Sequence, residues 1–155
     1  MAYAQTTDVP IDRSKAQIEE VLRRHGSEGF GYMTHGGKAQ VVFQFQKIPF
    51  RIELKMPESE EFERTPRGRS RRGQAIEREY EQACRSKWRA LLLVIKAKLE
   101  AVEQGISTIE HEFAADIVME GGKTLGQVLD KQLSGGKLKA IPMFAGDFSG
   151  EGEKS

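Results

Sequence analysis

The sequence predicts an α+β protein in which a small antiparallel sheet packs against helices. Three runs of alternating apolar and polar residues follow a helix-like segment, and a thirty-residue run without Gly or Pro then shows helical spacing. At 155 residues the chain has the length of one domain. We therefore expect a single domain over residues 1–155, with an N-terminal helix, a three-stranded antiparallel meander, one long helix and two short C-terminal helices.

The first helix is predicted within DRSKAQIEEVLRRHG, residues 12–26. Ser14 followed by Gln17 has the spacing of a capping box, and Gly26 supplies a stop signal. The apolar residues of this segment fall on one face, which we expect to pack against the sheet: Ile18, Val21 and Leu22.

Three strands are predicted from the period-two pattern. Gly36 and Gly37 form a hairpin turn signal between GFGYMTH (29–35) and KAQVVFQFQ (38–46), and PFRIELKMP (49–57) repeats the alternation. Consecutive strands joined by short turns indicate a meander with one buried and one polar face. The side chains expected to point inward are Ala39, Val41, Phe43 and Phe45 on the second strand, and Phe50, Ile52, Leu54 and Met56 on the third.

Residues 57–73, PESEEFERTPRGRSRRG, are predicted to form a long basic loop, because they carry too little apolar surface to pack as a regular element. Five arginines fall within nine positions, although the formal net charge of the chain is only +1. Two interpretations stay open. The arginines either pair with the preceding glutamates in a solvated loop, or they hold an anionic ligand through charge-assisted hydrogen bonds.

The long helix is predicted from about Gln74 to Glu103, with Gly105 as its stop signal. The stretch ALLLVIKA (90–97) is apolar nearly all round, whereas a helix lying on one sheet needs only an apolar stripe. Another surface should cover the second side of this helix. We infer self-association of the chain through the long helix.

The same helix carries a line of basic residues. Arg78, Arg85, Arg89 and Lys96 are spaced by 7, 4 and 7 residues and therefore share one face. If the basic loop folds back along this face, the two form one electropositive surface, with Trp88 as a stacking partner for a base. The alternative for Trp88 is a place in the core or an interface, because it shares a stripe with apolar residues of the helix.

Two short helices are predicted after the long one. Ser107 with Glu110 has the capping-box spacing before the first, and Thr124 is expected to cap the second, LGQVLDKQL (125–133). The tail from about residue 145 is Gly-rich and charged, so we expect it to be flexible.

No catalytic motif stands out. Glu53-Leu54-Lys55 mimics the E-x-K of restriction-type nucleases, but the preceding strand offers Gln44 and Gln46 where those enzymes have an Asp, and a divalent metal would lose a carboxylate ligand. The single cysteine excludes an internal disulfide. We expect no catalytic residue, no metal and no cofactor.

The sequence also lacks membrane signals. No apolar run approaches the length of a bilayer span, and the first residues show no signal-peptide pattern. Together with the lone cysteine, this favours a cytoplasmic protein that does not contact a membrane.

The stretches TPRGRSRRG (65–73) and EREYEQACRSKWRALLLVIKAKLEAVEQGISTIEHEFAADIVMEGGKTLGQ (77–127) resemble a group of small bacteriophage and prophage proteins, with a likeness from about Val9 to Leu129. We identify the group as the Thoeris anti-defence family of cyclic nucleotide sponges. The resemblance implies binding of a cyclic ADP-ribose signal, and in some members of cyclic oligonucleotides, without cleavage. It also implies a homo-oligomer, for example a hexamer, in the host cytoplasm.

Two functions are therefore weighed. The first is an anti-defence protein that sequesters cyclic nucleotide immune signals. The alternative is a phage nucleic-acid-binding protein that acts in recombination or packaging through the same basic surface. The predicted ligand-binding residues come from the residue pattern and not from the resemblance: Arg67, Arg69, Arg71, Arg72, Arg85, Trp88 and Arg89.

Overall fold

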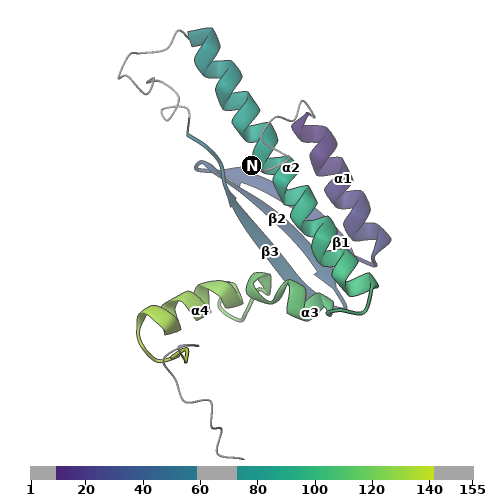
Figure 1. Ribbon diagram of the computed structural model, residues 1–155, viewed down its shortest axis with the longest axis vertical. Coiled ribbons are helices and arrows are strands. Elements are labelled where there is room, and N and C mark those ends of the chain that lie inside the picture. The colour runs from purple at the N-terminus through teal and green to yellow at the C-terminus, as the bar shows by residue number, and fades with distance from the viewer. Residues whose placement is uncertain (1–9, 59–72, 142–155) are drawn as a thin grey trace, which may run out of the picture.

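The computed structural model describes residues 10–58 and 73–141, and the predicted α+β architecture is confirmed (Figure 1). Most of the predicted basic loop (59–72) and the predicted tail from about 145 lie outside these ranges. The elements in order are α1 (Ile11–Arg24), β1 (Gly29–His35), β2 (Lys38–Phe45), β3 (Ile48–Lys55), α2 (Gly73–Glu103), α3 (Ile109–Glu112), the 3-10 turn η3 (Ala114–Asp116) and α4 (Leu125–Ser134).

The sheet is an antiparallel meander in the order β1-β2-β3. Gly36 and Gly37 turn the first hairpin, with φ angles of 57° and 73°, as their sequence predicts. The second hairpin turns at Gln46 and Lys47, whose φ angles are 49° and 66°. Two-residue hairpins favour positive φ at both turn positions, because that twist matches the twist of the strands. The second turn is not marked in the sequence, because neither Gln46 nor Lys47 is one of the residues that favour positive φ, which are Gly, Asn and Asp.

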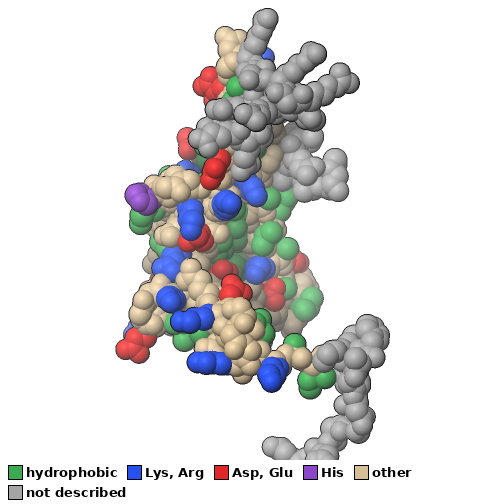
Figure 2. All heavy atoms as spheres, turned by 90° about the vertical axis from the view of Figure 1, so that its left-hand side faces the viewer, with side chains coloured by type: hydrophobic (Ala, Val, Ile, Leu, Met, Phe, Trp, Pro, Cys, Tyr) green, Lys and Arg blue, Asp and Glu red, His purple; other side chains and the backbone are tan. Residues whose placement is uncertain are grey.

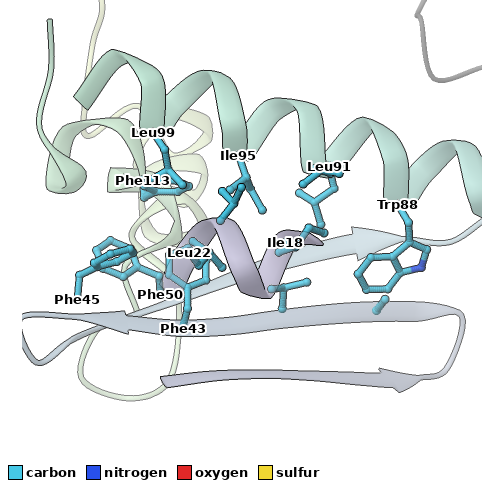
Figure 3. Close-up of a cluster of buried hydrophobic side chains, with 14 of the residues drawn as sticks. Ile18, Leu22, Phe43, Phe45, Phe50, Trp88, Leu91, Ile95, Leu99 and Phe113 are labelled. Atoms are coloured by element: carbon cyan, nitrogen blue, oxygen red, sulfur yellow. The ribbon is translucent and has the colours of Figure 1, made fainter. Parts of the chain in front are cut away.

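Helices α1 and α2 pack on the same face of the sheet, and the core lies between them and β2 and β3 (Figure 3). The helices run in the same direction, because Gln17 contacts Arg89 and, further along both helices, His25 contacts Glu103. The predicted inward side chains of β2 are all buried. Of the four predicted for the third strand, Phe50 on β3 and Met56 directly after it are buried, while Ile52 and Leu54 are partly buried.

Two predicted helix starts are wrong by a few residues. Helix α1 begins at Ile11 after Pro10, and Ser14 lies inside it on the buried face. At α3, Thr108 is the N-cap and its hydroxyl accepts a hydrogen bond from the His111 amide. The cap of α4 is confirmed, because the Thr124 and Gln127 side chains each bind the backbone amide of the other.

Helix α2 is covered more fully than its sequence indicates. Leu91, Leu92 and Ile95 are buried, and α1 packs against one flank of the helix. Val94, at 48%, is the most exposed of the large aliphatic side chains of α2, and Ile76, Leu93 and Val102 are partly buried. The second side of the ALLLVIKA stretch is therefore covered in large part by α1 within one chain, and self-association through α2 stays a prediction.

The C-terminal segment attaches to one end of the sheet and of α2 (Figure 1). Phe113 is fully buried against the rings of Phe43 and Phe50, with centroids 5.4 and 6.0 Å away. The ammonium of Lys98 donates to the Glu112 carbonyl over 2.7 Å. The segment is therefore joined to the core by aromatic packing and held to α2 by a charge-assisted hydrogen bond.

Asp116 in this segment makes stability depend on pH. Burial raises the pKa of its carboxyl, and the charge of Lys98 opposes that rise only in part. The unfolded chain has an Asp pKa of about 3.9, and the folded protein has a higher one. The free energy of unfolding therefore falls as pH rises through the range between these two pKa values, because the folded state holds the proton more tightly. We expect Asp116→Asn to raise the melting temperature at pH 7 but not at pH 3. Thermal melts across this range, with the exposed Asp130→Asn as control, test it; an equal gain at every pH would contradict it.

Candidate functional site

The structure describes three of the seven predicted ligand-binding residues. Arg67, Arg69, Arg71 and Arg72 lie outside the described residues. Arg85, Trp88 and Arg89 lie on α2, in the part of the helix that packs beside α1 and the sheet.

Trp88 does not fit the predicted role of a stacking partner. Its side chain is 2% exposed and belongs to the core (Figure 3). The ammonium of Lys15 lies 4.8 Å from the Trp88 ring centroid and 4.3 Å from that of Tyr32, whose ring meets Trp88 edge-on. A base cannot reach the face of a ring that is buried and already covered by a cation. The alternative role predicted from helical spacing, a place in the core, is correct for Trp88.

Arg85 and Arg89 lie one turn apart on the flank of α2 that meets α1. Arg89 donates through Nη1 to Oε1 of Gln17 on α1 over 2.8 Å. Arg85 donates through Nη2 to Oε1 of Gln82 over 2.7 Å, and its Nη1 lies 3.9 Å from Glu81. Both guanidinium groups are therefore held in place by one or two side chains, with further donors left over.

Some of the remaining polar atoms in this region are buried without a hydrogen-bond partner, which is unusual in a folded protein. In the described ranges, three buried side-chain nitrogen or oxygen atoms have no hydrogen-bond partner: Ser14 Oγ, Arg85 Nε and Arg89 Nε. Ser14 lies one turn before Gln17 on α1, as Arg85 lies one turn before Arg89 on α2, so the four side chains are in register along the two parallel helices. We call Ser14, Gln17, Arg85 and Arg89 the α1–α2 arginine cluster.

Leaving a buried donor unpaired costs free energy, so a cluster of such groups calls for an acceptor. Sequence reasoning identified Arg85 and Arg89 but missed Ser14 and Gln17, which it interpreted as a capping pair. Their spacing places them on one face of α1 in either case. Only the position of α2 reveals that Gln17 on this face meets Arg89.

The residues of the nuclease-like pattern lie elsewhere, on the outer face of the sheet that α1 and α2 leave uncovered. Glu53 forms an ion pair with Lys38 over 2.9 Å, and this hydrogen bond lowers the pKa of the Glu53 carboxyl. The cross-strand neighbour of Glu53 is Gln40. Within the described residues, no three His, Cys, Asp or Glu side chains gather as metal ligands do.

The cysteine and the outer-face groove of the described residues do not point to a further site. Burial raises the pKa of the Cys84 thiol, which favours the protonated and unreactive form. A groove of 340 Å³ on the outer face is lined largely by glycine and apolar residues, among them Gly31, Val42 and Val118. Its one charged residue, Arg51, already donates to the Gly122 carbonyl. None of the helices in the described ranges is long and apolar enough to cross a membrane.

Basic side chains do not merge into one patch on the face seen in Figure 2. Lys and Arg side chains are separated there by acidic and uncharged ones, over the part that grey atoms leave visible. A protein that tracks a nucleic-acid backbone usually presents a continuous basic stripe. This face of the described residues therefore offers isolated cations.

No protein-family model, curated protein or solved structure matches this chain.

Proposed function

We propose that this protein binds a phosphate-bearing cyclic nucleotide and sequesters it without cleavage, as an anti-defence sponge does. The observation that carries the proposal is the pair of buried, unpaired Nε–H groups on Arg85 and Arg89, one turn apart on α2. The sequence resemblance supplies the ligand class, with cyclic ADP-ribose isomers as the first candidates.

The chemistry of arginine supports a phosphate ligand. A guanidinium presents five N–H donors in a planar fork, and one edge of that fork matches two oxygens of a phosphate. Each arginine of the cluster donates its hydrogen bond from an Nη atom, and its Nε–H stays unpaired within the described residues. Phosphate oxygens would pair these donors, and Ser14 Oγ would add a neutral one.

The predicted basic loop extends the same proposal. Residues 56–72 join the end of β3 to Gly73, the first residue of α2. Arg85 lies twelve residues further, about 18 Å along the helix. A loop arginine can reach Arg85 only if enough residues separate it from Gly73, and the six residues from Arg67 to Gly73 span about 20 Å when extended. Of the four predicted loop arginines, Arg67 and Arg69 are therefore proposed to complete the phosphate site from the other side, whereas Arg71 and Arg72 are too close to the start of α2.

Calorimetric titration of the purified protein tests the proposal. We expect a cyclic ADP-ribose isomer to bind with submicromolar affinity, to raise the melting temperature, and to be recovered intact by mass spectrometry after heat denaturation. Cleaved ligand would contradict sequestration and favour an enzyme. Absence of binding to all cyclic ADP-ribose isomers and cyclic dinucleotides would contradict the ligand class.

The nucleic-acid alternative is tested on the same sample. A DNA-binding protein loses affinity steeply as salt rises, because each neutralised phosphate releases counterions. Tight duplex binding with that salt dependence, and no response to cyclic nucleotides, would replace the sponge proposal by the alternative. We expect no DNA binding even at low salt.

A further inference from the structure

The two edges of the sheet are built differently. At the β3 edge Pro49 has no N–H, and its carbonyl accepts the Val118 amide over 2.9 Å. The following outward positions of β3 carry the charged residues Arg51, Glu53 and Lys55. Proline, charge and a covering segment are the devices by which proteins keep a strand edge from pairing with another chain. The β3 edge is therefore protected.

Among the described residues, none of these devices protects the β1 edge. Its sequence, GFGYMTH, contains no Pro, Asp, Glu, Lys or Arg, and its register with β2 runs without a break from Gly29 to His35. Tyr32 and Met33 are 51% and 62% exposed, although both are large side chains. A seven-residue uncharged edge with exposed aromatic and apolar side chains is a strand prepared for pairing.

The hairpin geometry tells which backbone groups of β1 face the open side. Residues that flank a two-residue turn exchange both hydrogen bonds, and such pairs alternate along the ladder. His35 and Met33 therefore bond toward β2, whereas Thr34, Tyr32 and Phe30 direct N–H and C=O outward. The same rule applied to β3 points the Pro49 carbonyl outward, where it does accept the Val118 amide. In the described ranges, Phe30, Tyr32 and Thr34 make no backbone hydrogen bond outside the sheet ladder.

These outward groups are symmetric about Tyr32. If a second copy approaches antiparallel, Tyr32 lies opposite Tyr32 and Phe30 lies opposite Thr34, and all their N–H and C=O groups are paired. On the outer face of the sheet, Gly31 then lies opposite Met33 and Gly29 opposite His35. On this outer face, the large side chains Met33 and His35 of one copy each meet a glycine of the other. The strand is thus complementary to itself in both hydrogen bonding and side-chain size.

We propose that two copies of this chain pair their β1 strands antiparallel about Tyr32, so that two three-stranded sheets become one six-stranded sheet. This assembly does not use α2, through which the sequence predicted self-association. It rests on the edge strand alone and is independent of the function proposed above.

A proline placed on each edge tests the pairing. Thr34→Pro removes an N–H that faces outward and no hydrogen bond to β2, so the sheet should still form. We expect it to raise the dimer dissociation constant by roughly tenfold or more, because two intermolecular hydrogen bonds are lost per dimer. Lys55→Pro is the matched control on the β3 edge and should leave dimerisation unchanged. Sedimentation equilibrium gives both constants, and circular dichroism checks that each variant is folded.

The dimer dissociation constants should be measured at physiological salt concentration. Lys15 lies over the Tyr32 ring, so the dimer brings two ammonium groups toward the two-fold axis. Salt screens their mutual repulsion.

A cysteine at the axis tests the register. In a hydrogen-bonded antiparallel pair the Cα atoms are about 5.5 Å apart, within the range that a disulfide spans. Tyr32→Cys should therefore give a covalent dimer on mild oxidation, while the native Cys84 is buried and should stay reduced. In Thr34→Cys the two introduced thiols would be four strand positions apart, roughly 14 Å, so the same oxidation should give no covalent dimer.

Three results would overturn the proposal. The first is a wild-type protein that stays monomeric at high micromolar concentration. The second is a dimer that Thr34→Pro and Lys55→Pro weaken equally. The third is cross-linking as efficient at residue 34 as at residue 32, which would show a different register or a different interface.

Discussion

Replacing Phe113 with Ala is expected to lower the free energy of unfolding by about 3 to 5 kcal/mol. Phe113 is fully buried and packs edge-on against Phe43 and Phe50, which themselves stack with centroids 5.3 Å apart (Figure 3). Removing the ring leaves a cavity, and the surrounding structure can relax only in part to fill it. Typical domains are stable by only about 5 to 15 kcal/mol. A large share of the molecules should therefore unfold at moderate temperature.

Urea unfolding followed by circular dichroism measures this loss. Ile106→Ala is the matched control, because it also deletes apolar atoms but at a side chain that is 80% exposed. We expect the control to change the unfolding free energy by no more than about 0.5 kcal/mol. Equal losses in the two variants would show that the C-terminal segment does not pack on the sheet through Phe113.

Changing Arg85 and Arg89 together to Lys is expected to weaken binding of the cyclic nucleotide by about a hundredfold or more. Lysine keeps the positive charge but lacks the Nε–H and the planar fork of the guanidinium. Each charge-assisted hydrogen bond that is lost removes about 1.5 to 3 kcal/mol. If the unpaired Nε–H groups hold the phosphate, charge alone does not replace them. Calorimetric titration of wild type and variant gives the two dissociation constants.

Arg78→Lys is the matched control for this experiment. Arg78 lies on the same face of α2 but is exposed, two turns before Arg85 and outside the α1–α2 arginine cluster. Unchanged affinity in the control together with a large loss in the double variant would support the cluster as the site. Equal affinity in all three proteins would place the phosphate elsewhere on the molecule.

Local patterns predict most of this fold. Alternation marks the strands, Gly36 and Gly37 mark the first turn, and the absence of Gly and Pro marks α2 from end to end. The start of α1 was misplaced because Ser14 and Gln17 match a capping box, and local sequence does not reveal that they pack against another helix. The second turn escaped notice because Gln46 and Lys47 adopt positive φ without a residue that favours it.

The candidate site was only half predictable. Charge spacing on a helix identifies Arg85 and Arg89, because residues that share a face can be counted. Their partners on α1 are fixed by how two helices far apart in sequence pack together, which spacing does not report. For Trp88 the same spacing allowed both a core and a surface role, and only the packing of α1, with Lys15 over the ring, decides for the core.

The large sequence separation between α1 and α2 also affects the order in which the parts of the chain fold. The hydrogen bond from Arg89 to Gln17 joins residues 72 positions apart, whereas the strands of the meander pair with their immediate neighbours. Short loops close sooner than long ones, so the hairpins can form while α1 still lacks its partner. During synthesis on the ribosome, the apolar face of the meander therefore waits for α2 to emerge.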